Sequence, residues 1–185
     1  PKEARSHIRC SVSQIDAILP EVLIEAEAVM SPTGLTAWFD GVTTLCGLGR
    51  GTELPVIFLE IMPAVVRASD ESIIAASSET AVFLSKALCG KAINPFLSTL
   101  PNLARRLESA DSLRHWFGLV RRVASEAPDG LGPLLTMLPA LAQQLTIGGL
   151  ANWIAFGLLA YRDQRHLYPE CFRLQTADAH AALPR

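Results

Sequence analysis

The sequence predicts an all-α fold built from repeated pairs of helices, and its composition and two recurring patterns support this prediction. Hydrophobic residues make up 50% of the 185 residues, whereas aromatic residues make up 6%. This balance suits helices packed through leucine, alanine, valine and isoleucine better than a β-sandwich. The first pattern is a proline inside an apolar, helix-like segment, in "LEIMPAVV", "LSTLPNLA" and "LTMLPALA". These segments place Pro63, Pro101 and Pro139 at two equal intervals of 38 residues.

A tryptophan in the pattern Leu-x-x-Trp is the second marker of the repeat. It occurs at Trp38, Trp116 and Trp153, and the first two lie 78 residues apart, or two periods of 39. We expect the missing member near residue 78, where "SSETAVFLSKALCG" keeps the helical pattern with smaller side chains. Each unit is then a Trp-type helix followed by a Pro-type helix. A period of about 38 residues is within the range of known helix-pair repeats and predicts a HEAT-like solenoid, in which the proline bends each helix to follow a curved array.

The repeat also predicts how the chain is organised. We expect a single helical-repeat domain over residues 1–185, and we interpret its start at Pro1 as a sign that it is part of a longer protein. At least three repeats are needed to bury a continuous core. The expected units are an N-terminal cap over about 1–32, repeats over about 33–70, 71–110 and 111–147, and a C-terminal cap over about 148–185.

Turn-rich connectors and capping residues predict the helix boundaries along the chain. The connectors are "GLGRG" from residue 47, "CGKAINP" from residue 89 and "EAPDGLGP" from residue 126. Pro55, Pro95 and Pro133 are expected in first helical turns, which tolerate proline. Ser78 and Ser112 are expected to cap the helices that follow them, because a serine hydroxyl can accept a hydrogen bond from an exposed backbone amide.

Charge is distributed unevenly along the chain, although the formal net charge is only −2. Residues 1–80 hold 5 basic and 11 acidic side chains, residues 86–122 hold 7 and 2, and residues 123–185 hold 4 and 5. A basic middle beside an acidic start can steer a charged protein partner, and solvated helix faces are the alternative interpretation. This balance argues against a nucleic-acid-binding domain, which would be strongly basic.

Two arginine doublets in the basic middle are the candidate partner-binding residues. Each doublet is expected to end a helix, where cations interact favourably with the helix dipole. That structural role is the alternative explanation of the doublets. The four candidates are Arg105, Arg106, Arg121 and Arg122.

Patterns typical of catalysis are absent from the sequence, so we expect no enzyme activity in this chain. There is no Gly-x-x-x-x-Gly-Lys-Ser/Thr phosphate loop, no Gly-x-Ser-x-Gly elbow and no His-Glu-x-x-His motif. Glu21 with Glu25 is interpreted as solvated surface, and Asp111 with His115 as a capping or surface pair. No residue is assigned to a metal ion or a cofactor. The four widely spaced cysteines are interpreted as small buried residues of a protein in the reducing cytoplasm.

The segment from Gly130 to Tyr161 contains no Asp, Glu, Lys or Arg, and it raises the alternative of a membrane-associated helical protein. Prolines, glutamines and a pair of glycines interrupt the segment. We therefore favour two buried helices, and we expect no direct insertion into a membrane.

The last third of the chain, "GLGPLLTMLPALAQQLTIGGLANWIAFGLLAYRDQRHLYPECFRLQTADAHAALPR" (residues 130–185), resembles the end of the helical region of NorD-like proteins. Residues 112–129 are similar to the same region, and earlier parts match mainly through the repeat. The relatives in this family include the nitric oxide reductase activation protein NorD and the Rubisco activase subunit CbbO. These proteins typically carry a C-terminal von Willebrand factor A domain with a metal-ion-dependent adhesion site.

The resemblance implies a non-catalytic adaptor or scaffold that works with a MoxR-class AAA+ ATPase. In this family the ATPase activates or remodels a client enzyme, which here would be nitric oxide reductase, Rubisco or another enzyme. The Asp-x-Ser-x-Ser metal motif of the family is absent, and the nearest approach is "DESII" at Asp70. We therefore expect no cofactor in this chain and a metal site only in a von Willebrand factor A domain outside it.

Overall fold

The structure is a computed structural model of the chain, and it describes residues 2–48, 53–87 and 89–163. Over these residues every regular element is a helix, which confirms the all-α prediction. Two 3-10 helices, η1 (Gly90–Ala92) and η2 (Pro128–Gly130), precede α5 and α7. The α-helices are α1 (Lys2–Glu27), α2 (Pro32–Cys46), α3 (Glu53–Ala68), α4 (Ile73–Lys86), α5 (Ile93–Leu107), α6 (Ala110–Glu126), α7 (Leu131–Gln144) and α8 (Ile147–Asp163).

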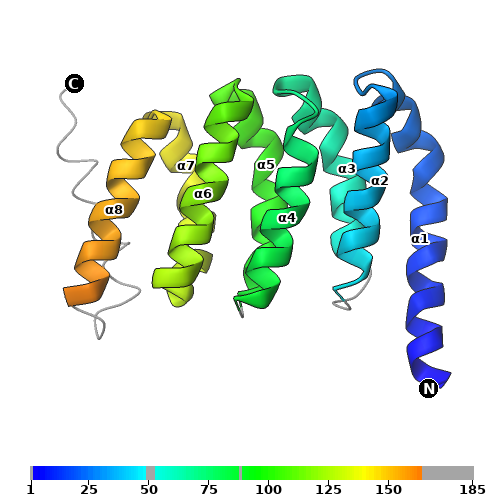
Figure 1. Cartoon of the computed structure of the whole chain (residues 1–185), viewed down its shortest axis with the longest axis horizontal. Helices are drawn as coiled ribbons and strands as arrows, with labels where there is room; N and C mark the ends of the chain where they lie inside the picture. The colour runs from blue at the N-terminus through cyan, green and yellow to red at the C-terminus, as the bar shows by residue number, and fades with distance from the viewer. Residues whose placement is uncertain (1, 49–52, 88, 164–185) are drawn as a thin grey trace.

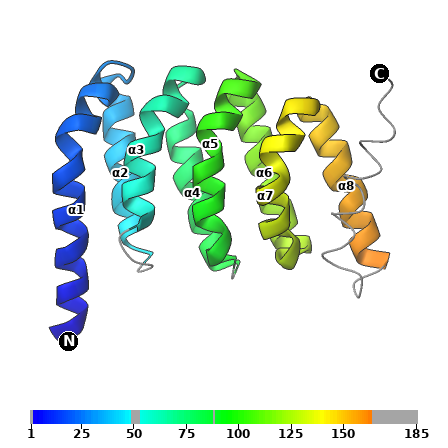
Figure 2. The ribbon, with the colours of Figure 1, turned by 180° about the vertical axis from the view of Figure 1, so that it is seen from behind.

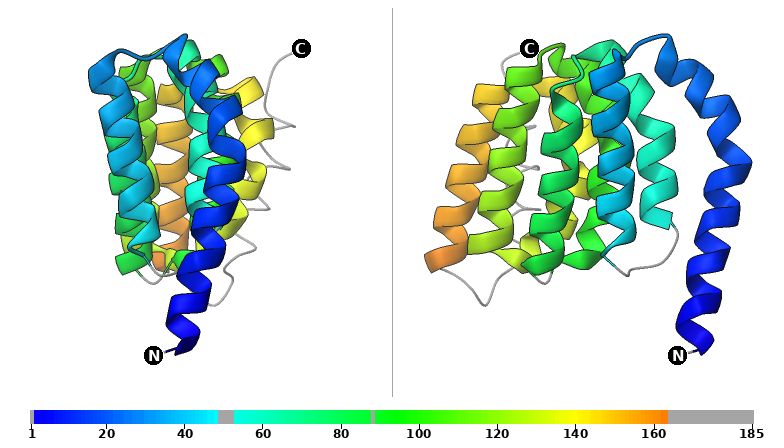
Figure 3. Two further views of the ribbon diagram at one scale, coloured as in Figure 1. Left: turned by 90° about the vertical axis from the view of Figure 1, so that its right-hand side faces the viewer. Right: turned by 45° about the vertical axis from the view of Figure 1, so that its right-hand side comes forward.

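The helices form two layers, in which each helix packs against the next one of its own layer. In one layer α1 packs against α3, α3 against α5 and α5 against α7; in the other α2 packs against α4, α4 against α6 and α6 against α8. Figure 1 shows the even-numbered layer in front, and Figure 2 shows the odd-numbered layer from behind. Successive helices run in opposite directions, so the helices within a layer run the same way, and Figure 3 shows the two layers nearly end-on. The architecture is helical-repeat-like.

Ser31 caps α2 and Ser109 caps α6, whereas the sequence predicted that Ser112 caps the second of these helices. The Ser31 hydroxyl accepts a hydrogen bond from the Gly34 amide at 3.2 Å, and the Ser109 hydroxyl accepts one from the Ser112 amide at 3.4 Å. Because the helix already begins after Ser109, Ser112 lies in its first turn. The prediction that Ser112 caps this helix was therefore wrong.

The prediction that Ser78 caps a helix was also wrong, because α4 begins earlier, at Ile73. The Asp70 carboxylate accepts a hydrogen bond from the Ser72 amide at 2.7 Å and shapes the turn that leads into the helix. Ser78 is buried inside α4, and its hydroxyl donates a hydrogen bond to the Ala75 carbonyl at 2.9 Å.

Proline occupies two kinds of position in the odd-numbered layer. Pro63 and Pro101 lie inside α3 and α5, and both helices continue for more than one turn beyond the proline. Pro139 falls within the residues of α7. Pro20 likewise lies inside α1. The remaining prolines of these helices lie in first helical turns, as predicted, where no intrahelical donor is lost. They are each the third residue of their helix: Pro55, Pro95 and Pro133.

The core lies between the two layers, and the tryptophans of the even-numbered helices contribute to it. Trp38 in α2 and Trp116 in α6 are fully buried, and Trp153 in α8 is partly buried. Ser77, midway in sequence between the first two tryptophans, is fully buried in α4. The indole Nε1 atoms of Trp38 and Trp116 have no acceptor among the described residues. A buried donor without an acceptor destabilises the fold by about 1–3 kcal/mol. The large apolar area that each buried ring removes from water offsets this cost.

The sequence led us to expect all four cysteines to be buried, but the two described cysteine side chains differ in exposure. Cys89 is buried, and its thiol lies 4.0 Å from the Ala124 carbonyl of α6. Cys46 is exposed, because it is the last residue of α2 and is turned by about 100° around the helix from the buried Leu45. The expectation of burial was therefore wrong for Cys46. Cys10 and Cys171 are outside the residues whose side chains are described.

The segment without charged residues forms two helices of the array rather than one long apolar helix. Leu131, Leu134 and Leu138 of α7 are fully buried, and α7 packs against α5. In α8, Leu150 and Ile154 are fully buried, and α8 packs against α6. Of the helices in the described ranges, none combines the length and the hydropathy that crossing a membrane requires.

Candidate protein-binding groove

A groove runs between α2 and α4 on the even-numbered layer. Its volume is about 450 Å³, which is within the size range of ligand-binding clefts. Small side chains dominate its walls, and two carboxylates also line it. The lining residues are Ala37, Asp40, Gly41 and Thr44 from α2, and Ala75, Ser78, Glu79 and Val82 from α4. We call this feature the α2/α4 groove.

Glycine allows α2 to approach its neighbours closely in this region. A Cβ atom added to Gly41 would lie 2.6 Å from Cε1 and 2.7 Å from Cζ of Phe58, a fully buried side chain of α3. The same added atom would lie 3.5 Å from Cβ of Ser78. The floor of the groove is therefore made of backbone and short side chains because there is no room for larger ones.

Hydrogen bonds tie the start of α2 to the turn before α4. The Ser31 amide donates to Oε2 of Glu71 at 2.9 Å, and the Ser31 hydroxyl donates to Oε1 at 2.8 Å. Gly34 is buried against the Glu71 side chain, and a Cβ atom added there would displace the Glu71 carboxylate from its present position. Ser31 precedes α2 and Glu71 precedes α4, so their hydrogen bonds hold the starts of the two helices together and fix one end of the α2/α4 groove.

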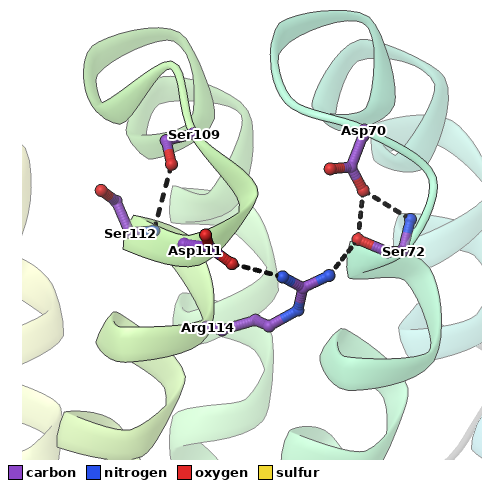
Figure 4. Close-up of polar contacts among 6 residues, drawn as sticks. All are labelled: Asp70, Ser72, Ser109, Asp111, Ser112 and Arg114. Atoms are coloured by element: carbon purple, nitrogen blue, oxygen red, sulfur yellow. Dashed lines mark hydrogen bonds and ion pairs between the residues drawn. The ribbon is translucent and has the colours of Figure 1, made fainter.

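The next junction, between α4 and α6, is covered by arginine. Figure 4 shows Arg114 of α6 reaching across to the hydroxyl of Ser72, which also bonds to the Asp70 carboxylate. Arg114 also pairs with Asp111 of its own helix at 2.6 Å. An arginine at this position therefore bridges two helices with one planar guanidinium group.

A second arginine, Arg121, crosses the same junction further along α6. Its Nε donates to Oγ1 of Thr80 at 3.1 Å, and its Nη2 lies 3.7 Å from Oε2 of Glu79. The guanidinium carbon lies 5.9 Å from the centre of the Phe83 ring, within the range of a cation–π contact. These three contacts place the arginine side chain along α4.

The two junctions differ at corresponding positions of the helices. Arg114 and Arg121 lie two residues before and five residues after the tryptophan of α6. At the same offsets from the buried serine of α4, the residues are Ala75 and Val82, and both line the α2/α4 groove. The groove is open because α4 has short side chains where α6 has arginines.

The two arginine doublets that the sequence singled out do not form one surface. Arg105 and Arg106 are exposed in the last turn of α5, as predicted. Arg121 and Arg122 are not in the last turn of α6, because the helix continues to Glu126. The expectation that this doublet ends its helix was therefore wrong.

The doublets also lie in different layers, since α5 is in the odd-numbered layer and α6 in the even-numbered layer. Arg105 bonds within its own helix, to the Pro101 carbonyl at 3.3 Å and to Asn102 at 2.6 Å. Arg122 pairs with Glu126 of its own helix at 2.9 Å. Arg121 contacts Thr80 and Glu79 of α4, so its neighbours give it a structural role.

Other charged residues from the sequence analysis lie at the surface. Glu21 and Glu25 are exposed on α1. Asp111 and His115 are exposed on α6, and the partner of Asp111 is Arg114 rather than the histidine. In the part of the chain that the structure describes, no three histidine, cysteine, aspartate or glutamate residues are grouped to hold a metal ion.

Sequence reasoning missed the residues that make the α2/α4 groove. Asp40 and Glu79 were not singled out, and neither were Ala75 and Val82. A signal was available, because small residues at the positions that hold arginine in α6 predict an open junction. Using that signal requires knowing that successive even-numbered helices lie side by side, which only the structure supplies.

Comparisons with known proteins do not identify a family. No family model matches the chain, and neither a curated protein nor a solved structure matches it.

Proposed function

We propose that this chain is a non-catalytic adaptor that binds partner proteins on the surface of its helical array. The observation that carries the proposal is the even-numbered layer, in which four helices run side by side and leave the α2/α4 groove open between two of them. Arrays of stacked helices provide extended surfaces of this kind for protein ligands. The exposed carboxylates and arginines on successive helices add charge complementarity, which steers association.

We also propose that the array is a HEAT-like solenoid with a period of about 38 residues. The helix bounds support this proposal, because the expected repeats 33–70, 71–110 and 111–147 each enclose nearly all of one even-numbered helix and the odd-numbered helix that follows. The positions of Pro63 in α3 and Pro101 in α5 also support it. Residues 164–185 of the expected C-terminal cap lie outside the described residues.

For the partner, we propose a MoxR-class AAA+ ATPase together with a client enzyme in the cytoplasm. The support is the NorD-like sequence pattern of residues 130–185, of which α7 and α8 cover the described part. The candidate contact surface includes Arg105 and Arg106, which are exposed on α5. The metal site of the family would belong to a von Willebrand factor A domain outside this chain.

A co-precipitation experiment tests the adaptor proposal. The purified chain is mixed with the MoxR-class ATPase encoded nearest to its gene, with and without ATP, and both binding and the ATPase rate are measured. We expect a stable complex and a changed ATPase rate. The double variant Arg105→Glu/Arg106→Glu should weaken the complex at least fivefold while changing the melting temperature little, because both side chains are exposed.

The outcome that contradicts the ATPase proposal is a folded, monodisperse chain that neither binds the ATPase nor changes its rate. The double variant Glu21→Gln/Glu25→Gln is the matched control, since it changes two exposed charges on the same layer of helices. Since the two double variants change the net charge in opposite directions, equal weakening by both would assign the effect to a general disturbance of this layer rather than to a contact at α5.

A further inference from the structure

We propose that the α2/α4 groove binds an arginine side chain presented by a partner polypeptide, a site that deepens the proposed adaptor function and rests on it. The first observation is the chemistry of the lining. Asp40 and Glu79 are the ionisable residues of the groove, and both are acidic and exposed. Glu79 is already paired with Arg121 of α6, so Asp40 is the carboxylate of the lining that has no cationic partner among the described residues. No basic side chain is part of the lining. The groove therefore favours a cationic occupant.

The second observation is that the molecule already contains the corresponding arginine site at the next junction. There the Glu79 carboxylate, two residues after the buried Ser77 of α4, pairs with Arg121. In α2 the residue two positions after the buried Trp38 is Asp40. No described residue forms an ion pair or hydrogen bond with the Asp40 carboxylate. Asp40 thus corresponds to a carboxylate that binds arginine, but no arginine of α4 faces it.

The third observation concerns the space above that carboxylate. Val82 occupies the position in α4 that corresponds to Arg121 in α6, and Ala75 occupies the position of Arg114. These short side chains leave a groove of about 450 Å³, whereas arginines cover the α4/α6 junction. An arginine from outside would fill the place that the sequence of α4 leaves open.

The groove suits the whole arginine side chain and not only its charge. Ala37, Ala75 and Val82 supply apolar contacts for the methylene stem. The planar guanidinium can donate to the Asp40 carboxylate in a bidentate arrangement. The Ser78 hydroxyl uses its proton in a hydrogen bond to Ala75, so its oxygen is oriented as an acceptor on the groove floor.

The test begins with a random 12-residue peptide library displayed on phage and selected on the intact chain. Counter-selection uses Val82→Arg, in which the chain supplies its own arginine to the groove. We expect the selected peptides to share an arginine. In fluorescence polarisation, replacing that arginine by citrulline, its neutral isostere, should weaken binding at least tenfold.

Variants of the chain then locate the site. Asp40→Asn should weaken binding of the selected peptide at least fivefold, and Val82→Arg at least tenfold. Matched controls are Asp16→Asn, which removes an exposed carboxylate on α1, and Thr36→Arg, which adds the same charge on α2 outside the groove lining. Both controls should bind within twofold of the parent chain. Circular dichroism confirms that each variant is folded.

Several results would overturn the proposal. These are selected peptides without arginine, equal binding of the citrulline peptide, or binding that Asp40→Asn and Val82→Arg leave unchanged. The adaptor function can fail separately. If the ATPase complex forms equally well with Asp40→Asn and Val82→Arg, the groove is not its contact site; if arginine peptides bind but the ATPase does not, the groove inference holds and the ATPase proposal fails.

Discussion

The junctions α2/α4 and α4/α6 both join neighbouring helices of the even-numbered layer, yet arginine side chains bridge only the second one. At α4/α6, Arg114 and Arg121 extend from α6 onto α4 and bond to Ser72 and Thr80. At α2/α4, no side chain of that length crosses the corresponding space, and a groove remains. The comparison teaches that helices with similar backbones can present a surface bridged by arginines or an open groove, depending on two positions of one helix.

The same comparison separates what holds each junction together. The α4/α6 junction uses polar contacts at the surface, which are individually weak. The α2/α4 junction depends on close approach of the backbone at Gly41 and on the hydrogen bonds between Ser31 and Glu71. We therefore expect a small added group to destabilise the α2/α4 junction more than loss of an arginine destabilises the α4/α6 junction.

The largest effect is expected for Gly41→Ala. The added methyl group would lie 2.6 Å from Cε1 of Phe58, which is fully buried and has little room to move. Overpacking of this kind costs about 1–3 kcal/mol. The better helix propensity of alanine offsets about 0.5–1 kcal/mol of this cost. The free energy of unfolding, measured by urea denaturation, should therefore fall by up to about 2 kcal/mol.

Gly118→Ala on α6 is the matched control for this prediction. Gly118 is exposed inside its helix, and an added Cβ atom meets no other atom within 4 Å. Since glycine in a helix is about 0.5–1 kcal/mol less favourable than alanine, this variant should be more stable than the parent. If Gly41→Ala were stabilised in the same way, the close packing of α2 on Phe58 would not be what shapes the open junction.

The secondary structure could be predicted from the sequence because apolar periodicity and proline positions report on local structure. Pro55, Pro95 and Pro133 marked first helical turns correctly. The start of α4 was missed because a turn at Asp70, and not a serine cap, begins the helix. The exposure of Cys46 was missed because composition predicts how often a residue type is buried, not which side of a helix end it occupies.

The candidate site was harder to predict, since its residues come from helices about 40 positions apart in the sequence. Arg121 was identified as a surface charge, but its partners Thr80 and Glu79 are on another helix. The pairing depends on the order of helices within a layer, which no local pattern encodes. No local sequence pattern points to Asp40, because its proposed role depends on the absence of arginine at the corresponding positions of α4.

A smaller effect is expected for Arg121→Ala at the α4/α6 junction. The variant loses a hydrogen bond to Thr80, a cation–π contact with Phe83 and a partly solvated ion pair with Glu79. Together these contacts should contribute about 1 kcal/mol to stability. Thermal unfolding should show a lower melting temperature than that of the parent chain.

Arg105→Ala is the matched control, because the bonds of Arg105 stay within α5. Its effect on the free energy of unfolding should be within about 0.5 kcal/mol. Equal losses of unfolding free energy for Arg105→Ala and Arg121→Ala would contradict the view that Arg121 stabilises the contact between α4 and α6.

The smallest effect concerns two thiols, one at the end of α2 and one beside α6. Partial desolvation raises the pKa of Cys46, and burial, reinforced by the nearby Asp129 carboxylate, raises the pKa of Cys89. The thiolate is the reactive form, so both should react slowly with iodoacetamide at neutral pH. Peptide mass spectrometry should find Cys46 modified first, because it is exposed and Cys89 is buried.

The raised pKa of Cys89 also predicts a pH dependence of stability. A thiol that holds its proton more tightly in the folded state stabilises the fold below the pKa of the unfolded chain, about 8.5, and this contribution is lost as the pH rises through the folded pKa. Between pH 8 and pH 10, Cys89→Ala should therefore lose less stability than the parent. Two results together would contradict the burial of Cys89: a pH dependence that Cys89→Ala leaves unchanged, and modification of Cys89 as fast as that of Cys46. They would mean that solvent reaches the Cys89 thiol beside α6 as readily as the Cys46 thiol at the end of α2.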